Sequence, residues 1–201
     1  MASQTHKNCL VLVSSVLYQF WTYFDLNRGA QRNCDLPKSM TQSIEEDFKH
    51  GMRRLAGAVH LITTSDGKTK QGLTATAVCS LTAAPPTLVA CVNKSASAHD
   101  ALLDNRVFAV NVLAQNQMHL AQLFADNSAI DKRFSRGDWT TRVTGAPILS
   151  GSLCNFDCRL IESVDRSTHT LLIGEAVDVS HADISKPLMY FDGGYTTVMS
   201  G

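Results

Sequence analysis

The amino-acid sequence predicts a mainly β protein, an antiparallel β-barrel that carries a few short helices. Segments rich in β-branched and apolar residues follow one another at short spacing, which is typical of barrels. Helical patterns are too few to supply the crossover helix that most pairs of parallel strands would require. The chain has 201 residues, of which 44 % are apolar and 18 % charged. It is therefore long enough to form one domain with a sizeable core.

The first predicted element is a helix over residues 43–55, with Ser43 as its N-cap. Ser97 is the expected N-cap of a short helix at residues 99–103, and a longer helix is expected at residues 116–126. The predicted strands cover residues 58–64, 72–81, 87–93, 107–113, 152–164, 168–179 and 189–198.

Residues 1–39 differ in character from the rest of the chain. Residues 9–24 are uncharged and mostly apolar, but this run is shorter than the ~20 residues that a membrane-spanning helix needs. Residues 27–37 show no periodicity, and Met40 then opens a polar stretch that leads into the first helix. We therefore expect residues 1–39 to be an extension, either disordered or upstream of a true start at Met40, and residues 40–201 to form the domain. A membrane anchor over residues 9–24 is the alternative.

The charge balance gives no sign of a nucleic-acid partner. The chain carries 18 Lys and Arg residues against 18 Asp and Glu residues, and no run rich in Lys or Arg appears. We therefore expect no nucleic-acid partner and, from the short apolar run, no membrane partner.

The cysteines predict reduced thiols rather than a metal site or a disulfide. They are Cys9, Cys34, Cys79, Cys91, Cys154 and Cys158, and they lack the paired Cys-x-x-Cys spacing of a zinc site. Cys154 and Cys158 would share one strand face, but same-face neighbours in a strand already lie about 7 Å apart, which is too far for a disulfide. Free thiols favour a cytoplasmic location.

Hydroxyl side chains alternate along residues 72–81. Thr74, Thr76 and Ser80 share one face of this predicted strand and are interleaved with small residues. Such a face suits a flat polar ring, because small side chains let backbone donors approach the ring while hydroxyls reach its polar edge. The alternative is an ordinary solvent-exposed face of an antiparallel strand.

A second candidate site follows at residues 93–97. Backbone N–H groups, serine hydroxyls and Lys94 come together at an expected helix start, which predicts an anion site. The alternative is a plain N-cap with a surface lysine.

The chain also resembles a known family. Residues 72–99 read GLTATAVCSLTAAPPTLVACVNKSASAH, which is similar to the flavin-binding signature of the short flavin reductases with an FMN-binding split-barrel fold. Further segments agree in the same order: LAGAVHLITT, FAVNVL, LAQLFA, DKRF, Trp139, GAPILSGSL, STHTLLIGEAVDV and PLMYFDGGY. The resemblance covers roughly residues 45–198 and implies a homodimer with a Greek-key barrel.

The resemblance, together with the hydroxyl-lined face, implies a set of site residues. The expected cofactor-binding residues are Thr74, Ala75, Thr76, Ala77, Ser80, Cys91, Val92, Asn93, Lys94, Ser95, Ser97, His99, Arg133 and Phe134. The flavin ring is expected against the strands, and the phosphate beside Lys94. Arg133 and Phe134 are expected to cover the site from the second subunit. His169 and Tyr195 are the expected catalytic residues beside the nicotinamide.

The implied activity is that of an NAD(P)H:flavin oxidoreductase, which transfers hydride from the nicotinamide to FMN and supplies free reduced flavin to a flavin-dependent monooxygenase. FMN is favoured over FAD, because the most similar families use it. The sequence has no Gly-x-Gly-x-x-Gly fingerprint that would locate the residue discriminating NADH from NADPH, so both stay open. The alternatives are a flavin-storage protein and an FMN-dependent oxidase of a small substrate. Hydrolase chemistry lacks a nucleophile with a matched base.

Overall fold

The computed structural model describes residues 38–183 and 186–198, so the predictions for residues 1–37 lie outside the described residues. The chain divides after Asp47 into two compact units, and helix α2 (Lys38–Met52) crosses this division. This helix begins before Ser43, which therefore cannot be its N-cap as expected. No helix in the described ranges has the length and apolar character needed to span a membrane.

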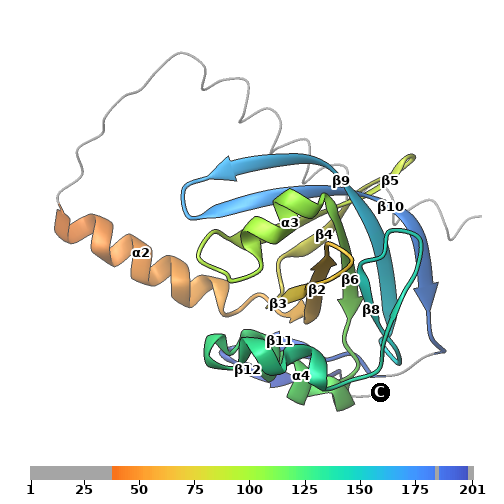
Figure 1. Ribbon diagram of the computed structural model, residues 1–201. Coiled ribbons are helices and arrows are strands. Elements are labelled where there is room, and N and C mark those ends of the chain that lie inside the picture. The colour runs from red at the N-terminus through yellow and green to blue at the C-terminus, as the bar shows by residue number, and fades with distance from the viewer. Residues whose placement is uncertain (1–37, 184–185, 199–201) are drawn as a thin grey trace, which may run out of the picture. The chain divides into compact units, whose positions relative to one another are not determined.

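The unit that begins at Phe48 is built on an antiparallel seven-stranded sheet in the order β3-β2-β6-β9-β10-β5-β4 (Figure 1). Its strands are β2 (His60–Ser65), β3 (Lys70–Ala75), β4 (Val78–Ala83), β5 (Pro86–Asn93), β6 (Val107–Val112), β9 (Cys154–Arg166) and β10 (His169–His181). Strands β5 and β10 pair although they are far apart in the sequence, and so do β2 and β6, which gives a Greek-key order. The prediction of a mainly β fold is confirmed.

Smaller elements surround this sheet. They are β1 (Gly57–Ala58), α3 (His99–Asn105), η1 (Gln115–Gln117), α4 (Met118–Ala125), η2 (Asn127–Ser135), β7 (Trp139–Thr141), β8 (Pro147–Leu149), β11 (Met189–Phe191) and β12 (Gly194–Thr196). The strand expected at residues 189–198 is the β11–β12 hairpin, which turns through Asp192 and Gly193 at positive φ. The β7–β8 hairpin was not predicted.

The single strand predicted at residues 72–81 is wrong, because the chain divides it into β3 and β4. Strand β3 pairs with β2 at one edge of the sheet, whereas β4 pairs with β5 at the other edge. Thr76 and Ala77 form the link between these edges, and the backbone N–H of Cys91 donates to the carbonyl of Ala77 at 2.9 Å. No Gly or Pro marks this break in the sequence. The break arises because β3 and β4 pair with different strands.

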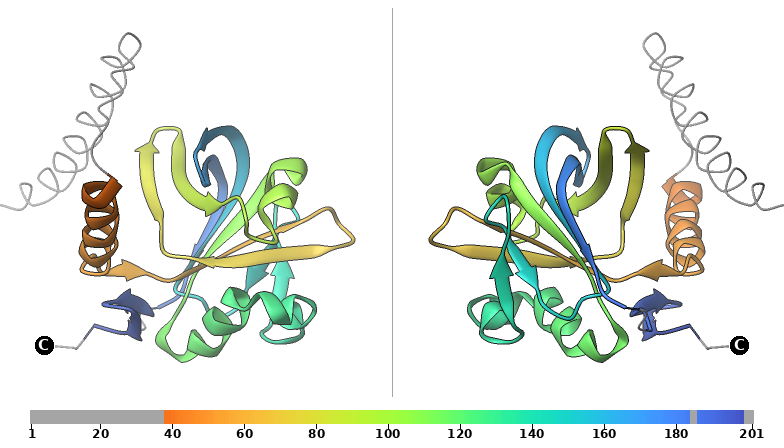
Figure 2. Two further views of the ribbon diagram at one scale, coloured as in Figure 1. Left: turned by 90° about the vertical axis from the view of Figure 1, so that its left-hand side faces the viewer. Right: turned by 90° about the vertical axis from the view of Figure 1, so that its right-hand side faces the viewer.

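Strand β2 lies between two hydrophobic clusters. Ile62 belongs to the first cluster together with Phe108 and with Leu102 of α3. Leu61, on the opposite face, belongs to the second cluster together with Phe124 of α4. The β2–β3 hairpin extends between these two helices in Figure 2. Because both faces of β2 are covered, five consecutive residues of this strand, 60–64, are buried instead of every second one.

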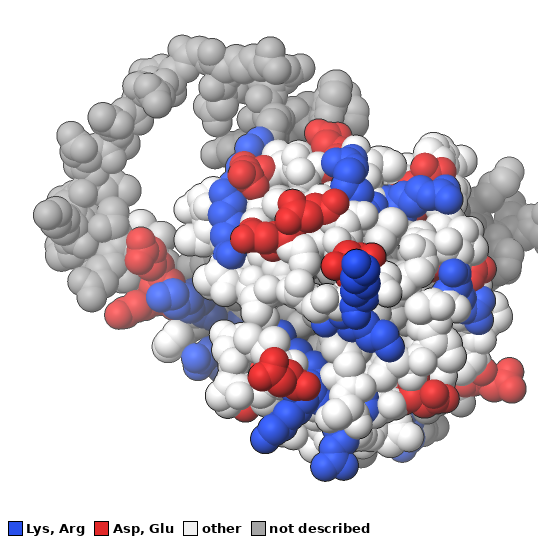
Figure 3. Space-filling view, in the orientation of Figure 1, with Lys and Arg blue, Asp and Glu red and all other residues white. Residues whose placement is uncertain are grey.

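Charged side chains are mixed in sign on the face of the molecule that Figure 3 shows. Lys and Arg residues alternate with Asp and Glu residues over this surface, in keeping with a formal net charge of zero. This face therefore offers no broad single-sign patch that would attract a polyanion.

Candidate functional site

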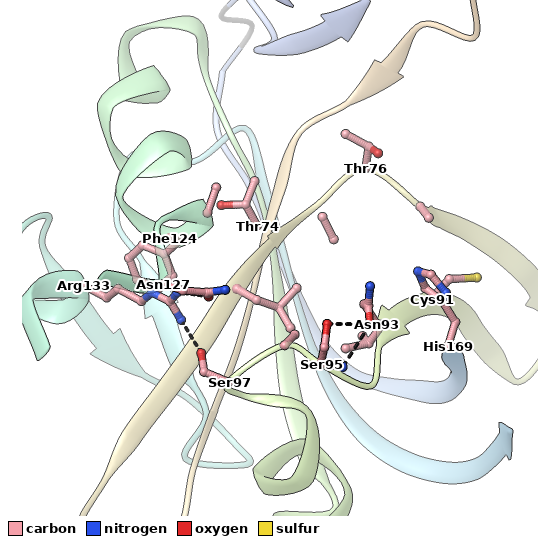
Figure 4. Close-up of a pocket in the computed structure, with 16 residues that line it drawn as sticks. Thr74, Thr76, Cys91, Asn93, Ser95, Ser97, Phe124, Asn127, Arg133 and His169 are labelled. Atoms are coloured by element: carbon pink, nitrogen blue, oxygen red, sulfur yellow. Dashed lines mark hydrogen bonds between the residues drawn. The ribbon is translucent and has the colours of Figure 1, made fainter. Parts of the chain in front are cut away.

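A cavity of about 400 Å³ lies at the link between β3 and β4 (Figure 4). This volume falls within the range of small-molecule sites. The lining residues come from β3 and its link to β4, the end of β5, the loop before α3, the end of α4, η2 and the start of β10. They are Leu73, Thr74, Ala75, Thr76, Ala77, Cys91, Val92, Asn93, Ser95, Ala96, Ser97, Phe124, Ala125, Asn127, Arg133 and His169.

One end of the cavity is cationic. The Arg133 side chain, 2 % exposed, donates to the carbonyl oxygen of Gly72 at 2.7 Å and to Oγ of Ser97 at 2.8 Å. Its second terminal nitrogen donates to the carbonyl of Asp126 at 3.0 Å. These bonds fix the guanidinium in place, and the Phe124 ring lies 5.9 Å from its central carbon.

The positive charge of Arg133 is not neutralised by an ion pair. Among the described residues, no carboxylate lies within ion-pair distance of its guanidinium, and its Nε–H has no hydrogen-bond partner. Burial lowers the pKa of the Arg133 guanidinium, and the charge of Asp126 opposes that shift. Arginine stays protonated at neutral pH all the same. A buried, unpaired cation of this kind favours a phosphate or carboxylate ligand.

The other end of the cavity is polar and lies beside the tip of the β9–β10 hairpin. Cys91, Asn93 and His169 lie at this end in Figure 4, away from Arg133 and Asn127. His169 pairs in register with Asn93, which brings both residues to the same rim. The Thr168 hydroxyl lies 2.9 Å from Nδ1 of His169 and orients the imidazole ring.

Small side chains line the wall between the two ends. Ala75, Thr76 and Ala77 offer little bulk, so a flat group can approach the backbone there. The Thr74 hydroxyl donates to the carbonyl of Ala121 at 2.7 Å, which ties β3 to α4. Thr74 can therefore still accept a hydrogen bond from a ligand, but its own proton is already in use.

Most of the predicted cofactor-binding residues come together in this cavity, and so does His169. Arg133 does so within the same chain, so the expectation that it reaches over from the second subunit was wrong. The reason is its hydrogen bond to Gly72, a residue distant in sequence that the fold brings beside it. Ser97 also lines the cavity, but it is not the N-cap of α3. That position is Ala98, which makes no side-chain capping bond.

Several predicted residues lie elsewhere. Ser80 lines a second cavity of about 370 Å³. Lys94 forms an ion pair with Asp165 and is not among the lining residues of the cavity, where Arg133 is buried instead. His99 is buried against Thr170.

Two aromatic side chains that were expected at the site pack into the second hydrophobic cluster. Phe134 lies edge-on to Phe124 with ring centres 5.2 Å apart. Tyr195 lies in β12 against Tyr190, 5.4 Å between ring centres, and outside the lining of the cavity. The structure therefore gives Tyr195 no contact with the site.

Phe124 and Asn127 line the cavity but were not among the predicted site residues. In the sequence, Phe124 has the helical spacing of an ordinary core residue, so nothing marks it as a site residue. Asn127 follows Asp126, whose carboxylate accepts from the Ser128 N–H at 2.7 Å, and this turn presents Asn127 beside Arg133. The Asp-x-Ser pattern that makes the turn was the one available signal for its position.

The thiols near the site are not suited to nucleophilic chemistry. Burial and the neighbouring Cys79 raise the pKa of the Cys91 thiol, so it stays protonated at neutral pH. Burial raises the pKa of Cys158 to about 12. All four described cysteines are free, which confirms that Cys154 and Cys158 do not form a disulfide. The described residues include no cluster of potential metal ligands.

Comparison with known proteins agrees with this geometry. The sequence matches the flavin reductase like domain over residues 52–199. It is 44 % identical over 152 residues to the FMN reductase (NADH) RutF of Stutzerimonas stutzeri, across 76 % of this chain and 87 % of that protein.

Solved structures give the same result. BorF, the flavin reductase component of a bacterial two-component tryptophan halogenase, aligns with a TM-score of 0.72 at 28 % identity, over 78 % of this chain and 99 % of that one. The NADH:FAD oxidoreductase SgcE6 of Streptomyces globisporus, solved with NAD and FAD fragments, aligns with a TM-score of 0.72 at 25 % identity, over 78 % and 94 %.

The fold, the cavity and these matches define an oxidoreductase of the flavin reductase class. The chain belongs to the flavin reductase like domain family, because the family's model matches well over half of its length.

Proposed function

We propose that this protein is an NADH-dependent FMN reductase that holds the flavin in the cavity beside Arg133. The observation that carries this assignment is the pairing of a buried, unpaired guanidinium with a wall of small residues in a chain of this family. The name of the Stutzerimonas relative, an FMN reductase that uses NADH, supports the choice of cofactor and co-substrate. The activity belongs to the domain at residues 40–201, and residues 1–39 take no part.

The residues present fit a phosphorylated flavin in one orientation. Arg133 and Ser97 receive the phosphate, because they form the cationic end of the cavity and because the Ser97 hydroxyl, which accepts from Arg133, keeps its own proton to donate. The ring lies against Ala75, Thr76 and Ala77, where small side chains leave room beside the backbone.

When bound, FMN supplies the redox chemistry by accepting hydride from the nicotinamide. The protein has to bring two flat rings into contact and orient them. His169 lies at the rim of the ring end and holds the nicotinamide there. Its ring is oriented by Thr168. Tyr195 receives no role in this proposal, since it packs against Tyr190.

The partner that fits this activity is a flavin-dependent monooxygenase served by reduced flavin that diffuses between the two proteins. BorF, one of the structural neighbours, is itself the reductase component of a two-component system. We also propose a homodimer, on the resemblance to this family, and a cytoplasmic location, which the four free cysteines support.

An anaerobic assay tests the proposed function. Purified protein is mixed with NADH, and NADH absorbance and flavin absorbance are followed together before and after addition of FMN. We expect NADH to be consumed only once FMN is present, with one flavin reduced for each NADH oxidised, and reduced flavin in an ultrafiltrate of the mixture.

The alternatives give different results in the same assay. A flavin-storage protein would retain FMN on the filter and leave NADH unconsumed. An oxidase of a small substrate would bind FMN and reduce it with that substrate instead of NADH. Either result would overturn the assignment as a reductase.

A further inference from the structure

A buried hydrogen bond joins the start of α3 to the strand that carries His169. Nε2 of His99 lies 2.9 Å from Oγ1 of Thr170, and both residues are buried, at 7 % and 0 % exposure. Thr170 is the residue directly after His169 on β10. Successive strand residues point to opposite faces, so the buried Thr170 faces the interior while His169 faces the cavity.

The direction of each hydrogen bond in this group follows from donor and acceptor chemistry. The Thr170 hydroxyl donates to Oδ1 of Asp165 at 2.7 Å, which uses its one proton. Its oxygen is therefore left to accept at the contact with Nε2 of His99, whose other ring nitrogen, Nδ1, lies 2.7 Å from Oδ1 of Asp100. The other oxygen of Asp165 pairs with Nζ of Lys94 at 3.3 Å.

This chain of contacts ties the hairpin tip to the loop that lines the cavity. The backbone N–H of Lys94 donates to the carbonyl of Thr168 at 2.9 Å, where the β5–β10 ladder ends. The Lys94–Asp165 pair is solvent-exposed and contributes little. The His99–Thr170 bond is the buried member of the group, and it fixes β10 next to His169.

We infer that His99 and Thr170 are positioning residues, whose buried hydrogen bond holds His169 at the cavity rim and thereby sets the affinity for the nicotinamide co-substrate. This inference rests on the proposed function, and it gives His99 a role different from the cofactor contact expected from the sequence. Neither residue touches the cavity, so the effect reaches the co-substrate through the strand.

The test is the kinetics of Thr170→Val, which keeps the shape of the side chain but removes the hydroxyl. We expect the KM for NADH to rise about fivefold, the change that corresponds to one buried hydrogen bond, with kcat and FMN affinity within about twofold of wild type. Thr170→Ser, which keeps the hydroxyl, is expected to restore the wild-type KM.

Thr64→Val is a matched control. Thr64 is also fully buried on a strand, donates to the carbonyl of Val107 at 2.7 Å and accepts from Asn105 at 3.1 Å. It lies outside the cavity lining. We expect Thr64→Val to lower the thermal midpoint as Thr170→Val does, without changing the KM for NADH.

A double-mutant cycle separates positioning from a general loss of structure. If Thr170 acts through His169, Thr170→Val has no further effect on the KM for NADH in a His169→Ala background. Additive effects of the two substitutions on the KM for NADH, or an unchanged KM in Thr170→Val, would overturn this inference. The proposed function would still stand in either case, provided that the wild-type protein is active. A wild-type protein that does not oxidise NADH with FMN present would instead overturn the proposed function itself.

Discussion

Replacing Arg133 with glutamine is expected to weaken FMN binding by roughly 10- to 100-fold, as the loss of charge-assisted hydrogen bonds from a buried site implies. Riboflavin, which lacks the phosphate, is expected to bind the variant and the wild-type protein about equally well. The measurement is the quenching of flavin fluorescence on titration with protein. It reports affinity directly, so a modest loss of stability does not enter the comparison.

The ratio of FMN to riboflavin affinity makes this prediction specific. Arg133 also holds the carbonyls of Gly72 and Asp126, so its loss disturbs the surrounding structure. A disturbance of that kind would weaken both flavins alike. Lys132→Gln removes the same charge from an exposed neighbour and is the matched control, for which we expect no change. Equal losses for FMN and riboflavin in Arg133→Gln would show that Arg133 does not bind the phosphate.

Gly174→Ala is expected to lower the free energy of unfolding by about 2–3 kcal/mol, because it overfills a closely packed core. A Cβ on Gly174 would overlap the Phe108 ring, with Cε1 at 2.7 Å, and would lie 3.2 Å from Cβ of Cys158. Phe108 is fully buried in the first hydrophobic cluster, so a shift of its ring disturbs other core side chains. Urea unfolding, with the midpoint and slope compared to wild type, gives the difference.

Two further variants check this explanation. A Cβ on Gly51 in α2 would meet no other atom within 4 Å, so Gly51→Ala is expected to be neutral or stabilising by up to about 1 kcal/mol. Phe108→Leu in combination with Gly174→Ala is expected to recover part of the loss, because it makes room for the added methyl group. A Gly174→Ala protein as stable as wild type would mean that Gly174 and the Phe108 ring are not closely packed.

The sequence was sufficient for the mainly β fold and for most of the cavity lining. The strand patterns at residues 107–113 and 168–179 are strong local signals, and the observed strands β6 and β10 have nearly the same bounds. The run at residues 72–99 contributes most of the cavity lining, because β3, β5 and the loop after β5 meet at one place.

The remaining features depend on contacts that local patterns do not encode. The break at Thr76 and Ala77 arises because β3 and β4 pair at opposite edges of the sheet. The position of Arg133 depends on its hydrogen bond to the carbonyl oxygen of Gly72. The hydroxyl of Thr74 donates to the carbonyl oxygen of Ala121, in a helix that is distant in sequence. Lys94 was expected at the phosphate, but the carboxylate of Asp165 holds it elsewhere. In each case the partner lies far along the sequence.

The central claim is that the cavity beside the β3–β4 link holds FMN with its phosphate at Arg133. A structure of the FMN complex tests this most directly. We predict the phosphate oxygens within hydrogen-bond distance of the Arg133 guanidinium and the Ser97 hydroxyl, with the ring against Thr76 and facing His169. A phosphate at the His169 end, or a flavin in the second cavity beside Ser80, would contradict the claim.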